Sequence, residues 1–153
     1  MTETGLDDRN RRRGNALRRG VAELTGAGIR IFARLITAVQ PEWRGAAPFG
    51  GQRIYYANHA SHGDFILIWS VLPARHRQRT RPVAGADYWG GGGLRGFVGS
   101  DVFNAVLIDR TRATPGSDPI ATMAGALDGG DSLILFPEGT RNLTDEILLP
   151  FKA

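Results

Sequence analysis

The distribution of apolar and polar residues predicts four short strands separated by helices. Four apolar runs occur at "RIYYA" (53–57), "PVAGA" (82–86), "AVLID" (105–109) and "SLILF" (132–136). Between them, "DFILIWSVLP" begins at Asp64, and "DPIATMAGALDGG" begins at Asp118, with Pro119 in a first-turn position and Gly129 at its end. Strands that alternate with helices are typical of a parallel sheet covered by helices. We therefore predict an α/β fold in which helices flank a mostly parallel central sheet.

The chain before residue 50 has a helical pattern. Between residues 20 and 40, apolar residues recur at spacings of three, four and seven, which predicts an N-terminal amphipathic helix. These residues are Val21, Leu24, Ile31, Phe32, Leu35 and Val39. The preceding residues 1–19 contain the basic cluster "RNRRRGNALRR" and are predicted to be a disordered tail. A connector rich in proline and glycine follows the helix, and residues 50–153 are expected to form one domain.

Two explanations of this helix remain open, because its apolar stripe would either pack on the core or lie in an anionic membrane interface. Fourteen of the 19 basic residues, but only six of the 15 acidic ones, lie at or before Arg81. Nucleic-acid binding is the weakest explanation, because no aromatic residue lies among the clustered arginines to stack on bases.

Length and composition limit the remaining classes. A chain of 153 residues can bury a core of its own. Cysteine is absent, which excludes disulfides, thiolate metal ligands and a cysteine nucleophile. No apolar run reaches the roughly 20 residues that cross a bilayer, and the N-terminus lacks the pattern of a signal peptide. The glycine-rich stretch "DYWGGGGLRGFVG" (87–99) does not match a phosphate-binding fingerprint and is predicted to be a mobile surface loop.

Chemically active side chains follow three of the four predicted strands. His59 follows the first strand, Arg110 follows the third, and the segment from Glu138 to Arg141 follows the fourth. Ligands of open α/β sheets bind beyond the carboxyl ends of the strands. These residues are therefore predicted to line one crevice.

His59 and Asp64 are the candidate catalytic residues. A metal site is disfavoured, because His59 and His62 are three residues apart and His76 is the only other histidine. Ser61 and Asp64 have capping-box spacing, which predicts a helix that begins near Ser61 and places its free N–H groups near Ser61 to Gly63. Asp64 would hold one imidazole nitrogen of His59 while the other faces the crevice. A base without a protein nucleophile indicates that the substrate supplies the hydroxyl.

Four motifs resemble those of the glycerolipid acyltransferases, the family of lysophosphatidic acid acyltransferase. "NHASHGD" resembles its N-H-x-x-x-x-D motif, and "FPEGTRN" resembles its F-P-E-G-T-R-S motif. "VLIDR" is similar to the second block of the family, and "LLPFK" to the beginning of the fourth. The resemblance covers about Gln52 to Lys152, in the order of the family.

The resemblance implies transfer of a fatty acyl group from acyl-CoA or acyl carrier protein to the hydroxyl of a lysophospholipid, most simply 1-acyl-glycerol-3-phosphate, in phospholipid biosynthesis. His59 would be the general base and Asp64 its orienting partner. The acceptor site would be formed by Glu138, Gly139, Thr140 and Arg141, with Arg141 and Arg110 on the phosphate. From the residues alone, Glu138 would either contact the acceptor or be structural, and Arg110 would either bind phosphate or pair with Asp109 or Asp64.

The sequence departs from the family at three places. Asn142 stands where the family has Ser, Leu107 stands where it usually has an aromatic residue, and the chain ends where family members continue. We expect a C-terminally truncated member, for which a non-catalytic lipid- or acyl-binding remnant is the alternative function. We also expect no cofactor besides the acyl carrier, no metal, no nucleic acid partner, and peripheral attachment to the cytoplasmic face of the cell membrane.

Overall fold

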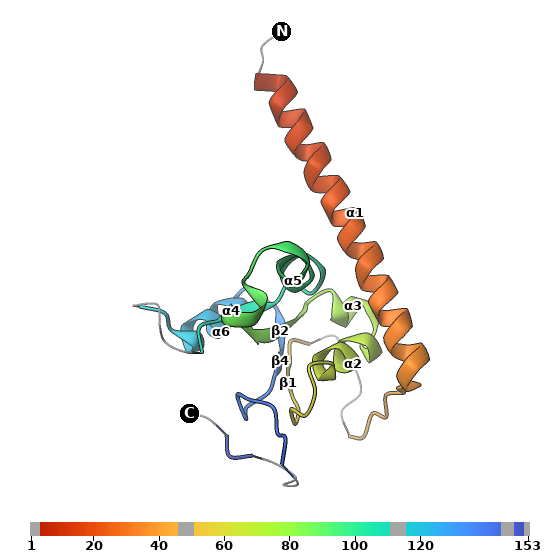
Figure 1. Cartoon of the computed structure of the whole chain (residues 1–153), viewed down its shortest axis with the longest axis vertical. Coiled ribbons are helices and arrows are strands. Elements are labelled where there is room, and N and C mark those ends of the chain that lie inside the picture. Colours follow the sequence, from red (N-terminus) through yellow and green to blue (C-terminus); the bar gives the residue numbers. More distant parts are fainter. Residues whose placement is uncertain (1–3, 46–50, 111–115, 145–148, 152–153) are drawn as a thin grey trace.

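A parallel sheet forms the centre of the protein in a computed structural model (Figure 1). The structure describes residues 4–45, 51–110, 116–144 and 149–151, with side chains from residue 14 on. The four strands are β1 (Ile54–Tyr56), β2 (Thr80–Gly85), β3 (Val106–Ile108) and β4 (Ser132–Leu135). They lie in the order β1-β4-β2-β3, and every pairing is parallel. The predicted α/β fold is confirmed, although β2 begins at Thr80, before its predicted start.

Helices cover both faces of this sheet. Side chains alternate between the two faces of a strand, so neighbouring residues of β4 enter different clusters. One cluster consists of Phe65, Trp69, Phe103 and Ile134, and the other of Val106, Ala126 and Leu133. Helix α2 (Asp64–Val71), helix α1 (Thr4–Thr37) and the π-helical turn η1 (Val98–Val102) lie on the first face. Helix α6 (Pro119–Asp128) lies on the second face.

Helix α6 forms where the sequence predicts it. The carboxylate of Asp118 accepts hydrogen bonds from the amides of Ile120 (2.8 Å) and Ala121 (3.1 Å), which satisfies the free donors of the first turn. Pro119 at the start of the helix does not destabilise it, because a backbone N–H at this position would have no acceptor within the helix.

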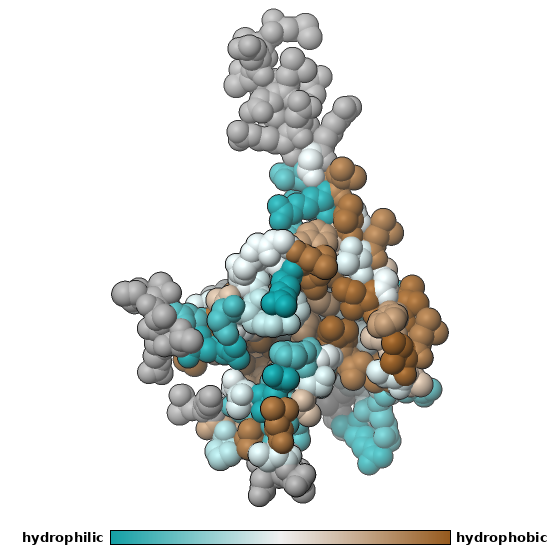
Figure 2. Space-filling view, in the orientation of Figure 1, coloured by the Kyte–Doolittle hydropathy of each residue, from teal (hydrophilic) through white to brown (hydrophobic). Residues whose placement is uncertain are grey.

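Helix α1 packs on the domain through small residues and turns its large apolar residues outward. Ala22, Gly26 and Ala33 are buried, and a Cβ at Gly26 would lie 3.2 Å from Val102 and 3.4 Å from Trp69. Leu24, Phe32 and Leu35 are 76%, 66% and 79% exposed. The predicted stripe therefore does not pack on the core, with the half-buried Val39 as its least exposed member. Figure 2 shows the resulting hydrophobic surface on the right of the molecule, along the lower half of α1.

The boundaries of this helix differ from those predicted. It begins before residue 20 and ends at Thr37, so residues 14–19, predicted to lie in a disordered tail, are helical. Among the described residues, no helix combines the length and the apolar character needed to cross a membrane.

The prediction of a mobile loop over residues 87–99 is wrong. The segment folds into α4 (Ala86–Trp89) and α5 (Gly93–Phe97) and leads into η1. Trp89 packs edge-on against Phe65, with ring centroids 5.8 Å apart, and the absence of a side chain at Gly99 lets it approach. Packing of the half-buried indole ring orders the segment, while glycines 90–92, whose helix propensity is poor, form the connection between the two helices. A further short helix, α3 (Ala74–Arg77), connects α2 to β2 and was not predicted.

Candidate active site

The carboxyl ends of the strands open into one cavity of about 460 Å³. His59 follows β1, Arg110 follows β3, and the turn with Gly139, Thr140 and Arg141 follows β4, and all five residues line this cavity. Asp64 and Glu138 are not among its lining residues. Residues from motifs about 80 positions apart thus meet because β1 and β4 are neighbours in the sheet, with Ile54 opposite Leu133.

Asp64 fixes the orientation of the His59 ring. Its Oδ2 lies 3.1 Å from His59 Nδ1, and both side chains are about one-fifth exposed, at 20% for His59 and 21% for Asp64. The imidazole also stacks on Phe136, with ring centroids 4.2 Å apart. With Nδ1 facing the carboxylate, Nε2 is the nitrogen left for a substrate hydroxyl.

The loop before α2 is organised by the same carboxylate. Asp64 Oδ2 accepts hydrogen bonds from the amides of Ala60 (2.7 Å) and Ser61 (2.8 Å), while Ser61 Oγ accepts one from the Gly63 amide (3.1 Å). The helix begins at Asp64 rather than near Ser61, so the predicted capping box is only half formed. Because the amides of Ser61 and Gly63 already have partners, they are not free helix-start donors.

Glu138 connects the two principal motifs. It is 1% exposed, and its Oε1 accepts a hydrogen bond from the His59 amide (3.1 Å), while Oε2 accepts one from the Leu149 amide (3.3 Å). The amide of Asn142 donates to the His59 carbonyl from the other side of the turn. Of the two roles that the sequence leaves open for Glu138, this geometry favours the structural one.

The turn after β4 depends on Gly139. Its φ of +65° lies in the left-handed region, where a side chain is strained, and its amide donates to the Phe136 carbonyl (3.0 Å). Asn142 then closes the next turn, because its Oδ1 accepts hydrogen bonds from the amide (2.9 Å) and hydroxyl (2.7 Å) of Thr144. The substitution of Asn for Ser at this position keeps a side-chain acceptor. Of "LLPFK", Leu148 and Lys152 lie outside the described residues.

Arg110 is held by a residue that the sequence reasoning missed. Its Nη2 donates to both carboxylate oxygens of Asp87 (2.7 and 3.0 Å), and its Nε donates to Oδ1 (3.2 Å). These hydrogen bonds lower the pKa of Asp87. The pair lies over Gly85, where a Cβ would overlap both side chains. Asp87 follows the end of β2, so the strand-end argument used for the other three strands would have found it.

Two other side chains complete the lining. Arg141 is half-buried and has no ion pair within the described part of the chain, so its guanidinium is available to an anion. His62 is exposed and lies beside the Tyr88 ring, with centroids 5.3 Å apart. Within the described ranges no group of three or more His, Asp or Glu residues is arranged to hold a metal ion.

Comparison with known families agrees with this geometry. The model of the family described as Acyltransferase matches residues 36–153, which include all the motifs and the whole sheet. The chain belongs to this family. Its domain supports acyltransferase activity in general, with an acyl donor and a lipid acceptor as substrates. Neither the curated proteins nor the solved structures that were compared gave a match.

Proposed function

We propose that the protein transfers a fatty acyl group from acyl-CoA or acyl carrier protein to the free hydroxyl of 1-acyl-glycerol-3-phosphate, giving phosphatidic acid. The observation that carries this proposal is the His59 and Asp64 pair, oriented by a 3.1 Å contact at the edge of a cavity that also holds Arg110 and Arg141. A base and two cations in one cavity fit an acceptor with both a hydroxyl and a phosphate.

The proposed reaction needs no nucleophile from the protein. His59 Nε2 removes the hydroxyl proton as the oxygen attacks the thioester carbonyl. Asp64 stabilises the imidazolium that forms. The tetrahedral intermediate then collapses, the carbon–sulfur bond breaks, and the thiolate takes the proton from His59. Arg141 and Arg110 hold the phosphate, because guanidinium groups match its geometry with parallel hydrogen bonds.

The test compares His59→Ala with His62→Ala. Both histidines line the cavity, but among the described residues only His59 contacts a carboxylate. Loss of a general base typically slows a reaction by about 10² to 10⁴-fold. We expect that loss in transfer to lysophosphatidic acid for His59→Ala and a near-normal rate for His62→Ala. Equal losses would contradict the assignment of the base, and an inactive parent protein that still binds both substrates would support a non-catalytic remnant.

We also propose that α1 attaches the protein to the cytoplasmic face of the cell membrane. Its exposed apolar residues are spaced along one helix, and both proposed substrates carry long acyl chains that partition into a bilayer. Deleting α1 would uncover Trp69, so polar substitutions are the cleaner test.

Leu24→Gln, Phe32→Gln and Leu35→Gln, combined in one variant, should strongly reduce co-sedimentation with vesicles that contain anionic lipid. The residual binding should weaken further with salt, because salt screens only the electrostatic part. Leu143→Gln is the matched control, since Leu143 is 77% exposed in the turn after β4. Unchanged sedimentation of the triple variant would place the attachment elsewhere.

A further inference from the structure

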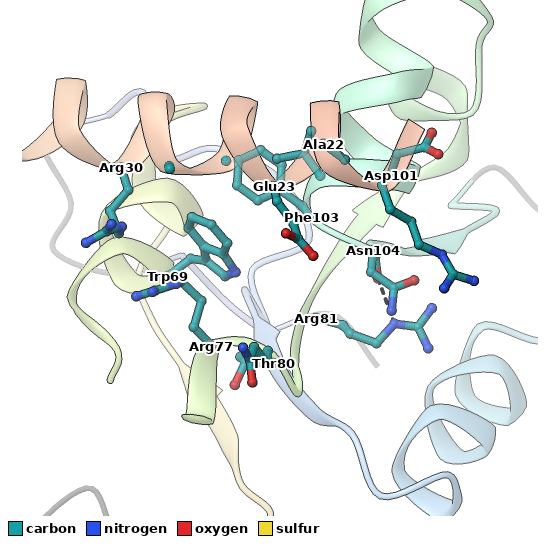
Figure 3. Close-up of a pocket in the computed structure, with 15 residues that line it drawn as sticks. Ala22, Glu23, Arg30, Trp69, Arg77, Thr80, Arg81, Asp101, Phe103 and Asn104 are labelled. Carbon is teal, nitrogen blue, oxygen red and sulfur yellow. Dashed lines mark hydrogen bonds between the residues drawn. The ribbon is translucent and has the colours of Figure 1, made fainter. Parts of the chain in front are cut away.

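A second cavity lies beneath α1, away from the candidate active site. It has a volume of about 320 Å³ and includes Thr80, where β2 begins, whereas the active-site cavity includes Gly85, where β2 ends. Its apolar wall is formed by Trp69, Val102 and Phe103, and α1 forms its roof (Figure 3). None of the acyltransferase motifs contributes a residue to it.

Two arginines, Arg30 and Arg77, lie at one end of this cavity, and the charge of a third, Arg34, acts on Arg77 from outside it. Arg30 and Arg77 line it, and Figure 3 shows their side chains on the same side of Trp69. Arg77 is half-buried, its guanidinium lies 5.2 Å from the centroid of the Trp69 ring, and its Nη1 donates to the Leu72 carbonyl (2.8 Å). Burial lowers the pKa of Arg77, and the positive charges of Arg30 and Arg34 lower it further. Arg34 lies one turn beyond Arg30 on α1 and is exposed.

The acidic residues nearby do not neutralise this cluster. Asp101 pairs with Arg18 (2.7 Å), and Asp131 pairs with Arg81 (2.9 Å). Glu23 also lines the cavity, but no carboxylate of the described residues lies within 4.0 Å of the guanidinium nitrogens of Arg30, Arg34 or Arg77. Like charges held together without a counter-ion repel one another, and a bound anion would remove that repulsion.

We propose that Arg30, Arg34 and Arg77 bind the phosphate of an anionic phospholipid. Guanidinium groups are suited to phosphate because their N–H groups form a fixed fork. A lipid source is favoured over a free phosphate, because Ile31, Phe32 and Leu35 are exposed within the same turns of α1 that carry Arg30 and Arg34. A lipid whose tails contact this apolar surface presents its phosphate at the level of the arginines. This site is separate from the proposed acceptor site and does not depend on acyl transfer.

The test is a calorimetric titration of the full chain with monomeric dihexanoylphosphatidylglycerol, below the concentration at which it forms micelles. Dihexanoylphosphatidylcholine and inorganic phosphate are the comparison ligands. The unmodified chain is titrated once with the anionic lipid, and all other titrations use an Arg141→Ala background, so that the candidate active site does not contribute its own anion binding. We expect the anionic lipid to bind in this background more tightly than either comparison ligand.

Arginine substitutions locate the site. Loss of a charge-assisted hydrogen bond weakens binding by about tenfold to a hundredfold, and we expect this for Arg77→Gln and Arg34→Gln. Arg79→Gln is the matched control, because Arg79 is exposed, carries the same charge and lies two positions from Arg77. Its affinity should stay close to that of the parent. Arg34→Gln keeps the test valid if Arg77→Gln does not fold, since the Arg34 side chain is exposed.

Three outcomes would overturn this proposal, each for a different reason. Equal weakening by Arg79→Gln would mean that binding reflects net charge only. Loss of binding in the Arg141→Ala background alone would assign the lipid to the active site. Equal affinity for inorganic phosphate or for the phosphatidylcholine would show that no anionic lipid is selected. An Arg77-dependent lipid site in a protein without transfer activity would refute the proposed function and leave this inference intact.

Discussion

Glu138→Gln is the substitution that best separates the two roles considered for the third motif. The carboxylate is buried, and each oxygen accepts a hydrogen bond from a backbone amide, one of them that of His59. Glutamine has nearly the same shape but keeps only one oxygen. Its NH₂ group would therefore face either the His59 or the Leu149 amide, donor against donor.

The expected cost follows from these two contacts. A hydrogen bond to a charged group contributes about 1.5 to 3 kcal/mol, and a buried donor left without a partner costs about 1 to 3 kcal/mol. Because these terms overlap, we expect the free energy of unfolding to fall by about 2 to 4 kcal/mol. For a chain of this size that corresponds to about 4 to 16 °C in Tm.

The assay combines thermal unfolding with steady-state acyl transfer. Glu42→Gln is the control for the same chemical change, because the Glu42 side chain is 72% exposed and its one ion pair within the described ranges is with Arg44 on the surface. Such a pair contributes about 0 to 1 kcal/mol, so the control should unfold near the parent temperature. In Glu138→Gln the backbone of His59 loses support, so kcat should fall while the acceptor KM stays nearly constant.

The opposite pattern would refute this reasoning. If Glu138→Gln were as stable as Glu42→Gln and raised only the acceptor KM, the carboxylate would have to contact the acceptor directly. The hydrogen bonds to the His59 and Leu149 amides would then have no energetic importance.

Three further predictions concern the phosphate side of the cavity. Arg141→Ala should raise the acceptor KM by about tenfold to a hundredfold and leave the donor KM unchanged, since it removes a charge-assisted hydrogen bond; an unchanged acceptor KM would place the phosphate elsewhere. Asp87→Asn should raise the acceptor KM only about two- to fivefold, because the ion pair between Asp87 and Arg110 is exposed. Gly85→Ala should raise the acceptor KM more strongly, because its Cβ would overlap Arg110. Normal acceptor KM values in both variants would remove Arg110 from the phosphate site. Because Arg110 lowers the pKa of Asp87, the small stabilisation from this pair should be fully present when the pH is above 3.8, the ordinary pKa of an aspartate, and should disappear as the pH falls further. The stabilities of Asp87→Asn and the parent, measured by acid unfolding, should therefore converge at low pH.

The sequence predicted the sheet because its strands are short, apolar and separated by recognisable caps. Ile134 and Leu133 are buried on opposite faces of β4, as a continuous apolar run in a covered sheet requires. The cavity was also predictable, because parallel strands place their carboxyl ends at one edge.

Other features depended on tertiary contacts that no local pattern records. The glycine-rich segment 87–99 has low helix propensity, yet Trp89 packs on Phe65 across the fold, and the residues on either side of glycines 90–92 are helical. The role of Glu138 depends on two amides distant from it in sequence, at His59 and Leu149. The outward direction of the α1 stripe depends on Gly26, whose lack of a side chain brings the opposite face of the helix against Trp69.

The strand order has a consequence for how the protein folds during synthesis. Of the four described strands, β4 is the last to leave the ribosome, yet it lies between β1 and β2 and pairs with both. A nascent chain that ends before Ser132 can pair only β2 with β3, and β1 has no neighbour. The pairing of β1 with β4 is also slow relative to local helix formation, because a long loop must close to bring these two strands together. His59 is therefore fixed only after β4 inserts, so the catalytic geometry cannot appear before β1 and β4 have paired.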